Sequence, residues 1–231
     1  SAPVPSASRR VIEMVTSPNN PDGDMRMPTI AVGNGSNAQV MMDHAYLWPH
    51  FVGVEAPVAY GDDTVATFTL SKLTGHASTR IGWAITSSEQ LAANLRKFIW
   101  TASFGVPREN QLRAVAVLRH VIGHDGDIFR YARALMLSRW RRLEQAFARS
   151  AEWVLHARDR PRPDAFSGER SYEPSPAYAW LLWRRGGDAT SELRRRVGVV
   201  GRPGTSFAAN SSFVRLELLM REPTFELMLE K

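Results

Sequence analysis

The order of secondary-structure signals along the chain is the feature that most constrains its fold. Four short segments rich in β-branched and apolar residues come first, each followed by polar or turn residues. They are Val11 to Thr16, Gln39 to Met42, Thr64 to Leu70 and Arg80 to Thr86. A helical half follows them, and a smaller set of strand and helix signals ends the chain. This order predicts an α/β fold in which the four segments are buried strands of one sheet.

The helical half has three predicted members. The first starts at Ser87, with Gln90 at the spacing of a capping box. The second lies between Pro107 and Gly123, which are good start and stop residues. The third runs from about Asp127 to Ala157 with apolar residues at helical intervals, which is long enough to bridge two domains.

The last part of the chain predicts a small α+β domain. The proline-rich stretch 158–176 is interpreted as a linker. Strand signals at 177–183 and 212–218 then alternate with helix signals near 191–196 and from residue 223. We therefore divide the chain into a first domain (1–125), a long connecting helix (126–160) and a small C-terminal domain (161–231).

Composition limits the classes of function. A chain of 231 residues that is 44% hydrophobic can bury a sizeable core. It has no cysteine, no apolar run long enough to span a membrane and no signal-peptide pattern, which favours a reducing, cytoplasmic location. Because it opens with Ser almost directly onto a strand pattern, we expect a fragment or a processed piece.

The net charge of +6 permits binding to nucleic acid. However, much of the excess arginine follows one helical pattern and the stretch after it, where solvated faces carry charge. Interleaved aromatic residues and recognition-helix motifs are absent, so we expect no nucleic-acid partner. We also predict no metal site.

Lys72 stands out because the chain has 3 lysines against 26 arginines. A primary amine can lose its proton and attack an aldehyde, whereas a guanidinium stays protonated. Lysine in an apolar segment followed by glycines therefore suggests Schiff-base chemistry, although a surface charge is the alternative. Thr69, Ser71 and Arg80 flank Lys72 and could offer two hydroxyls and a guanidinium to one phosphate. Together these residues suggest pyridoxal 5'-phosphate as the cofactor.

This cofactor makes further demands that the sequence can meet. Its pyridine nitrogen is a good electron sink only when protonated, which requires a carboxylate. Asp43 ends an apolar segment and could serve, or it could simply cap the strand. Tyr46 and Asn20 are candidates for contacts with the phenolic oxygen of the cofactor.

Several motifs in order now resemble a known family. They are Ser-Pro-Asn-Asn-Pro-Asp-Gly (17–23), Asp-His-Ala-Tyr (43–46) with Trp-Pro-His-Phe (48–51), Ser-Lys-Leu-Thr-Gly-His (71–76) with Arg-Ile-Gly (80–82), and Phe-Val-Arg-Leu (213–216). They resemble the plant alliinase and tryptophan aminotransferase-related family. The resemblance covers essentially the whole chain.

The resemblance implies a fold of the aspartate aminotransferase type. Residues 1–125 would be the C-terminal part of the large cofactor-binding domain, with a mostly parallel sheet flanked by helices. Lys72 would form the Schiff base and move the proton, and Asp43, Tyr46, Asn20, Thr69, Ser71 and Arg80 would bind the cofactor. Arg215 would bind the α-carboxylate of the substrate, with a surface strand arginine as the alternative.

Two features depart from the family pattern. Ser78 replaces a Gly two positions before the phosphate arginine, where a required positive φ would cost stability. The resemblance also begins inside the large domain. The family's preceding part holds the aromatic that stacks on the cofactor, a second phosphate loop and part of the dimer contact.

The leading hypothesis is an aminotransferase acting on an aromatic L-amino acid, with L-tryptophan converted to indole-3-pyruvate for auxin synthesis. A 2-oxo acid would accept the amino group, and a homodimer is expected. The first alternative is an alliinase-type carbon–sulfur lyase acting on S-alkyl-cysteine sulfoxides. The second is a non-catalytic truncated remnant of the family.

Overall fold

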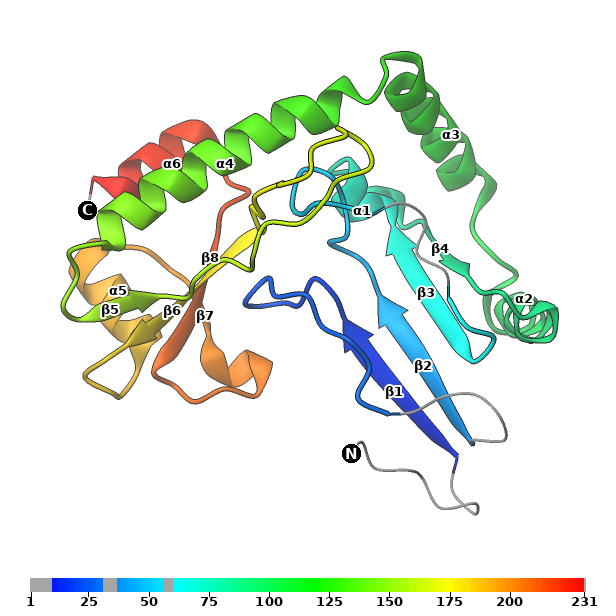
Figure 1. Cartoon of the computed structure of the whole chain (residues 1–231), viewed down its shortest axis with the longest axis horizontal. Helices are drawn as coiled ribbons and strands as arrows, with labels where there is room; N and C mark the ends of the chain where they lie inside the picture. Colours follow the sequence, from blue (N-terminus) through cyan, green and yellow to red (C-terminus); the bar gives the residue numbers. More distant parts are fainter. Residues whose placement is uncertain (1–9, 31–36, 56–59, 231) are drawn as a thin grey trace. The chain divides into compact units, whose positions relative to one another are not determined.

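Two compact units make up the computed structural model, which describes residues 10–30, 37–55 and 60–230. Unit 1 comprises residues 1–18, 25–48 and 55–129, and unit 2 comprises residues 19–24, 49–54 and 130–231. Figure 1 follows the chain through both units. The domain boundaries predicted from the sequence stay predictions.

Unit 1 contains a mixed, mostly parallel sheet. Its strands are β1 (Val11–Thr16), β2 (Ala38–Asp43), β3 (Thr64–Thr69) and β4 (Gly82–Ile85), in the order β1-β2-β3-β4 (Figure 1). The pairs β1–β2 and β2–β3 are parallel, and β4 runs antiparallel to β3. The α/β class and the mostly parallel sheet are thus confirmed.

One face of this sheet carries a core. Successive side chains of a strand point to opposite faces, so Val15, Val40, Met42 and Ala66 share a face and are buried there. Tyr60 packs against them. The expectation of four buried strands is wrong for β4, in which all four residues are exposed.

Strand β3 leads directly into the predicted lysine segment. It ends at Thr69 because the side chain of Thr69 caps the short helix α1 (Leu70–Leu73). A 3₁₀ turn, η1 (Ala77–Thr79), then leads into β4. Lys72 therefore lies on a helical turn rather than at a strand end.

Two helices follow in unit 1, α2 (Glu89–Ser103) and α3 (Arg108–Gly123). The N-cap of α2 is Ser88 rather than the predicted Ser87, since the Ser88 hydroxyl accepts the Leu91 N–H. Helix α3 buries Ala114 and Val121 against Leu70 and Leu73 of α1. Helix α2 buries none of its residues.

Helix α4 (Asp127–Phe147) is shorter than predicted. The sequence pattern extended it to Ala157, but the apolar run after it forms β5 (Trp153–Leu155). Trp153 donates its N–H to the Ser150 hydroxyl and pairs with Trp183 of the neighbouring strand. Pairing with β6 therefore makes this segment a strand. Periodicity alone does not distinguish a short apolar strand from the end of a helix.

Unit 2 has the α+β architecture expected of the small C-terminal domain, although it includes residues outside the predicted range 161–231. Its antiparallel sheet has the order β5-β6-β8-β7, where β6 is Tyr178–Trp183, β7 is Arg202–Pro203 and β8 is Phe213–Glu217. Helices α5 (Ala189–Val197) and α6 (Glu222–Leu229), the 3₁₀ turn η2 (Gly204–Phe207) and α4 complete it. The core joins Trp140 and Leu143 of α4 to Leu181, Val214 and Phe225.

The stretch 158–176 has no helix or strand of its own, as expected for a linker, but it packs within unit 2. Its Tyr172 and Asp164 are buried, and Arg162 and Tyr172 form an isolated antiparallel bridge. Across the described parts of the chain, none of the helices combines the length and the apolar character needed to cross a bilayer.

Candidate active site

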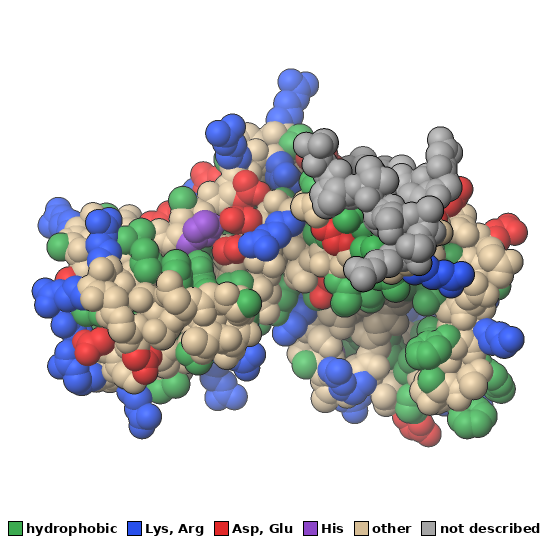
Figure 2. Space-filling view, turned by 90° about the horizontal axis from the view of Figure 1, so that it is seen from below, with side chains coloured by type: hydrophobic (Ala, Val, Ile, Leu, Met, Phe, Trp, Pro, Cys, Tyr) green, Lys and Arg blue, Asp and Glu red, His purple; other side chains and the backbone are tan. Residues whose placement is uncertain are grey.

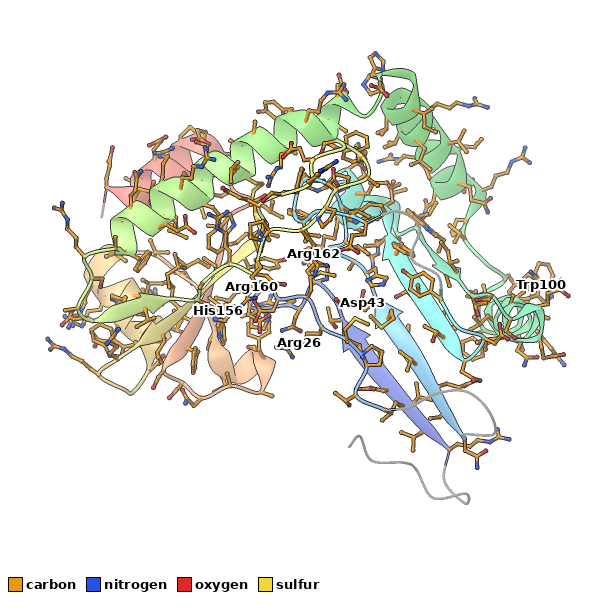
Figure 3. The ribbon with its side chains drawn as sticks, viewed as in Figure 1. Arg26, Asp43, Trp100, His156, Arg160 and Arg162 are labelled. Carbon is orange, nitrogen blue, oxygen red and sulfur yellow. The ribbon has the colours of Figure 1, made fainter. Side chains whose placement is uncertain are left out.

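Three elements of unit 1 bring predicted site residues to one edge of the sheet. Strands β2 and β3 are parallel neighbours, and Asp43 at the end of β2 pairs with Thr67 near the end of β3. Thr69 and the helix α1 with Lys72 come directly after. Ligand sites of α/β sheets collect at such carboxyl ends, and Figure 3 labels Asp43 there.

Asp43 is half-buried and held in a local turn. One of its carboxylate oxygens, Oδ1, accepts the N–H of Ala45 at 3.0 Å, and the next residue, His44, donates its N–H to the carbonyl of Thr67 at 2.9 Å. These bonds fix the backbone on both sides of the carboxylate. The predicted carboxylate is therefore rigidly placed at the strand end.

Tyr46 and Lys72 lie together. The amine Nζ of Lys72 is 5.4 Å from the centroid of the Tyr46 ring, and the ring itself is buried. A cation over an aromatic face is favoured electrostatically. The structure thus places the predicted amine beside the predicted phenol.

Thr69 and Ser71 surround the start of α1. The Thr69 hydroxyl accepts the Ser71 N–H at 3.2 Å and donates to the carbonyl of Ile81 at 3.3 Å. Both hydrogen-bonding roles of this hydroxyl are thus used within the chain. Contact with a phosphate would require Thr69 to release the carbonyl of Ile81.

Arg80 is exposed and has a left-handed backbone, with φ 50° and ψ 45°. Its Nη1 donates to the carbonyl of Ala77 at 3.1 Å. Such a conformation costs a non-glycine residue on the order of 1 kcal/mol. Ser78, for which a positive φ was considered, lies inside η1 and is not among the positive-φ residues, so Arg80 carries this strain instead.

Asn20 and Arg215 meet in unit 2. Nη1 of Arg215 donates to Oδ1 of Asn20 at 2.8 Å. The guanidinium carbon of Arg215 lies 3.6 Å from the centroid of the Tyr178 ring and 4.9 Å from that of Phe207. Arg215 is buried, and its Nε has no hydrogen-bond partner in the described structure. Arg215 is thus not an exposed strand arginine, and its role toward a substrate stays a prediction.

Sequence reasoning overlooked His44. Its Nδ1 lies 2.6 Å from the carbonyl oxygen of Ser17, and its Nε2 is buried with no hydrogen-bond partner in the described structure. Burial lowers the pKa of His44 below its ordinary value of 6.5, against the opposing effects of the Ser17 carbonyl and Asp43. Its place between Asp43 and Ala45 in the quoted motif was the available signal.

His156 was overlooked as well. Its Nε2 lies 3.0 Å from Oδ1 of Asp24, which ends the turn that carries Asn20. The carbonyl of Asp24 accepts the N–H of Asn19 at 2.8 Å. No feature of the sequence signals a pairing over such a separation.

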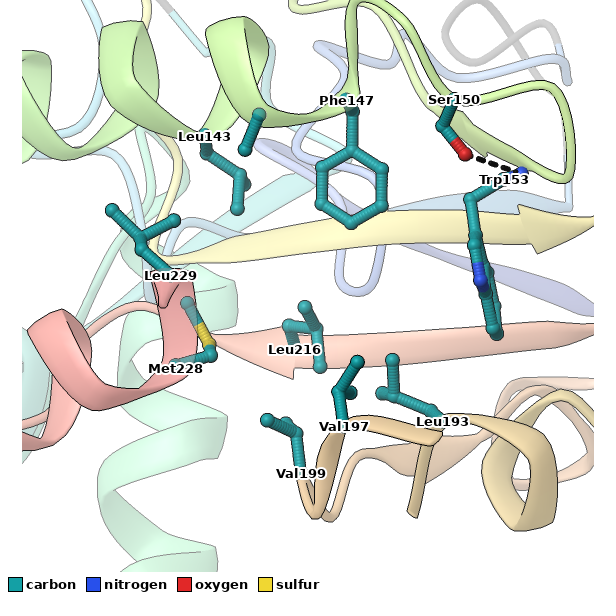
Figure 4. A pocket seen from close by; sticks show the side chains of 11 residues that line it. Leu143, Phe147, Ser150, Trp153, Leu193, Val197, Val199, Leu216, Met228 and Leu229 are labelled. Carbon is teal, nitrogen blue, oxygen red and sulfur yellow. Dashed lines mark hydrogen bonds between the residues drawn. The ribbon is translucent and has the colours of Figure 1, made fainter. Parts of the chain in front are cut away.

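A hollow in unit 2 is a different kind of feature (Figure 4). It has a volume of about 220 Å³ and is lined by Leu143, Phe147, Trp153, Leu193, Leu216 and other apolar residues, with Ser150. None of the predicted site residues lines it, and no charged group does. The hollow therefore does not belong to the candidate active site.

Comparison with known proteins decides the family. The family profile Alliinase_C, described as Allinase, matches residues 4–231. The chain belongs to this family.

Curated relatives of this alliinase-family chain fall into two groups. Tryptophan aminotransferase-related protein 4 of Arabidopsis thaliana is 36% identical over 219 residues, covering 94% of this chain and 46% of the relative. Alliin lyase 1 of Allium sativum is 30% identical over 233 residues, covering 96% and 45%. The chain thus spans about half the length of the curated relatives it matches.

Solved structures show the fold. A methionine aminotransferase from Escherichia coli superposes with a TM-score of 0.74 at 17% identity, over 98% of this chain and 59% of that chain. A PLP-dependent aminotransferase from Streptococcus suis gives 0.70 at 17% identity, over 97% and 56%. The alliinase-family chain therefore has the aminotransferase fold that the motifs implied.

Family and fold imply pyridoxal 5'-phosphate as the cofactor, and the donor set of unit 1 fits it. Lys72 offers a primary amine, Asp43 a carboxylate, Tyr46 a phenol, and Thr69 and Ser71 hydroxyls, all at or just after the ends of β2 and β3. These are the groups needed to bind an aldehyde, a pyridinium and a phosphate. The role of each residue remains a prediction.

Proposed function

We propose that this chain supplies the lysine-bearing part of a pyridoxal phosphate-dependent aminotransferase that acts on an aromatic L-amino acid. L-Tryptophan is the proposed donor, and indole-3-pyruvate, a precursor for auxin synthesis, is the proposed product. The observation that supports this proposal best is the placement of the Lys72 amine beside the Tyr46 ring, at the sheet edge that carries Asp43.

The residues of the chain have distinct tasks in this proposal. Nζ of Lys72 takes the α-proton of the amino acid and later returns it. The carboxylate of Asp43 holds a proton on the ring nitrogen of the cofactor. Pyridoxal phosphate, when bound, acts as the sink for the electron pair left at the α-carbon.

Arg215 and Asn20 bind polar groups in the same proposal. The fork geometry of Arg215 suits the α-carboxylate of an amino acid. Because Oδ1 of Asn20 already accepts from Arg215, the amide nitrogen of Asn20 is the group that remains to donate to the phenolic oxygen of the cofactor. Thr69, Ser71 and Arg80 are the proposed phosphate ligands, with the Thr69 hydroxyl turning away from Ile81. A homodimer and a cytoplasmic location complete the proposal.

A titration tests the chemistry of Lys72. Pyridoxal phosphate added to the purified protein should produce an imine absorption band, and Lys72→Ala should lack it. Lys72→Arg keeps the charge and should lack the band too, because guanidinium does not form the imine. A parent protein without the band would support the alternative of a non-catalytic remnant, which the half-length match to the relatives motivates.

The carbon–sulfur lyase remains the second candidate, because alliin lyases are among the relatives. The two activities use different co-substrates. Transamination of tryptophan requires pyruvate, whereas a lyase releases pyruvate from an S-alkyl-cysteine sulfoxide alone. Pyruvate release from the sulfoxide without added oxo acid would overturn the aminotransferase proposal.

A further inference from the structure

The apolar hollow of unit 2 interrupts the core of this unit (Figure 4). Its most buried lining residues are Leu143 of α4, Leu193 of α5 and Leu216 of β8, which are 1%, 5% and 3% exposed and belong to the core. Protein interiors contain few voids larger than a water molecule. A hollow of about 220 Å³ next to these residues is therefore more than loose packing.

The hollow reaches the surface of the protein. Ala146 of α4 lines it and is exposed, and four further lining residues are half-buried: Phe147, Trp153, Val199 and Met228. These residues come from α4, β5, the segment after α5, and α6, so separate elements surround the opening (Figure 4). A small molecule can therefore enter from solution while unit 2 stays folded.

Apolar groups dominate the wall of the hollow. Leu, Val, Phe and Met side chains supply most of it, and its polar side-chain groups are the hydroxyl of Ser150 and the indole N–H of Trp153. Figure 2 shows basic side chains (blue) over much of the surface of unit 2, on the left, yet no described residue that lines the hollow is charged. Because burial of an unpaired charge is costly, this wall selects an uncharged occupant.

The volume of the hollow sets the size of its occupant. About seven water molecules would fill it at roughly 30 Å³ each, but each buried water needs two to four polar partners, which the two polar side chains of this wall do not supply. An apolar ligand displaces such poorly held water favourably. An apolar cavity of roughly 150 Å³ accepts the six ring atoms of benzene. On the same scale the hollow holds about nine atoms, which is the size of a fused two-ring molecule.

We propose that the hollow is a binding site for an uncharged, fused two-ring aromatic molecule. The Ser150 hydroxyl accepts the backbone N–H of Trp153 at 3.0 Å, and its second lone pair suits one polar atom of the ligand, such as a ring N–H. The site is separate from the proposed substrate contact at Arg215. Leu216 lines the hollow, and its neighbour Arg215 points to the opposite face of β8, against the Tyr178 ring.

Calorimetric titration tests this proposal without cofactor or activity. The probes are indole and benzoate, which have the same number of non-hydrogen atoms but differ in charge. Indole should bind the purified chain at one site with a Kd on the order of 1 mM or tighter, as expected for a ligand of this size. Benzoate should bind at least roughly tenfold more weakly, because its carboxylate would meet no charged partner in the wall.

Two variants that fill the hollow locate the site. Ala146→Trp and Val199→Phe introduce rings from two different lining segments and should each weaken indole binding by roughly tenfold or more. Ala134→Trp is the matched control, because Ala134 is also exposed on α4 but does not line the hollow, and it should keep the affinity of the parent. Thermal unfolding checks that each variant is folded, and Ala146→Trp should pass because Ala146 is exposed.

Any of three outcomes would overturn the proposal. The first is a folded parent chain without saturable indole binding, or with benzoate bound as tightly as indole. The second is indole binding that both filling variants leave unchanged, which would place the indole elsewhere in the chain. The third is self-association of the chain that Ala146→Trp abolishes, which would assign the hollow to a second copy. None of these outcomes depends on the imine band of Lys72, so this test and that of the proposed function can fail separately.

Discussion

The guanidinium of Arg215 donates a hydrogen bond to the side-chain oxygen of Asn20 at 2.8 Å, across 195 residues of sequence. Both residues were predicted to bind polar groups of the cofactor or substrate. Within unit 2 they already form one polar pair, with Arg215 packed against the Tyr178 ring. The two side chains are thus joined by a direct hydrogen bond within unit 2.

Removing the amide of Asn20 should destabilise unit 2. Asn20→Ala would leave Nη1 of the buried residue Arg215 without this acceptor, beside an Nε that has no partner in the described structure, at a cost of about 1–3 kcal/mol. Asn20→Asp keeps an acceptor and adds an opposite charge, so it should retain the stability. Urea unfolding measures the difference in stability between the two variants. Equal stabilities would contradict a stabilising role for the hydrogen bond between Arg215 and Asn20.

His44 should make stability depend on pH. Its pKa is lowered by burial in the folded state, so below the ordinary value of 6.5 the unfolded chain binds more protons at this site than the folded chain. The contribution of His44 to the free energy of unfolding should therefore be complete at a pH above 6.5. This contribution should decrease progressively as the pH falls below 6.5.

The variant His44→Asn tests this dependence, because its amide N–H can replace the Nδ1 contact with Ser17 but does not titrate. The pH profile of its unfolding free energy should be flatter than that of the parent. His76→Asn, at an exposed histidine, is the control and should keep the slope of the parent. Parallel profiles for all three proteins would refute the prediction.

Gly82 should not tolerate a side chain. A Cβ at this position would lie 2.6 Å from the backbone carbonyl oxygen of Phe68, in the antiparallel pair of β3 and β4. Gly82→Ala should lower the unfolding free energy by about 1–3 kcal/mol, because backbone must shift to accept the methyl group. Gly61→Ala, where the methyl group meets no atom within 4 Å, should be close to neutral in the same denaturation experiment.

Arg139 should be sensitive even to lysine. Its side chain is 3% exposed, and it donates to the carbonyl of Leu218 at 2.6 Å and to the carboxylate of Glu222 at 2.6 Å. A single ammonium does not reproduce the guanidinium fork, so Arg139→Lys should cost about 1–3 kcal/mol in guanidinium chloride unfolding. Arg141→Lys, at a side chain 60% exposed, should change little, and a loss as large as that of Arg139→Lys would argue against the role of the fork.

Local sequence signals located most strands and helices. Val11–Thr16 was predicted with its observed ends, and β6, α3 and α5 were found within a few residues. In each of these elements the residue propensities, the apolar pattern and the flanking turn or cap residues agree. Where a long-range contact had to decide, as for Trp153 pairing with Trp183, the helical pattern was misleading.

The candidate site divides in the same way. Lys72, Thr69 and Ser71 are close in sequence, so their proximity follows from the local chain. Asp43 joins them because two parallel strands end at one edge, which the alternation of strands and loops already suggested. The pairing of His156 with Asp24 had no local signal, because it joins segments 132 residues apart.

The sequence by itself determined the chemistry available to this protein: one amine in an apolar segment, a carboxylate at a strand end and the ordered motifs of the alliinase family. Tertiary structure alone decided which of these groups form hydrogen bonds within the chain. Asn20 accepts one from Arg215, and Thr69 donates one to the carbonyl of Ile81. Among the described residues, it also decided that Ile12 and Met14 of the parallel sheet are exposed. The hydrogen bonding and the exposure of a side chain depend on which distant segments pack against it. Local propensity carries no information about such packing.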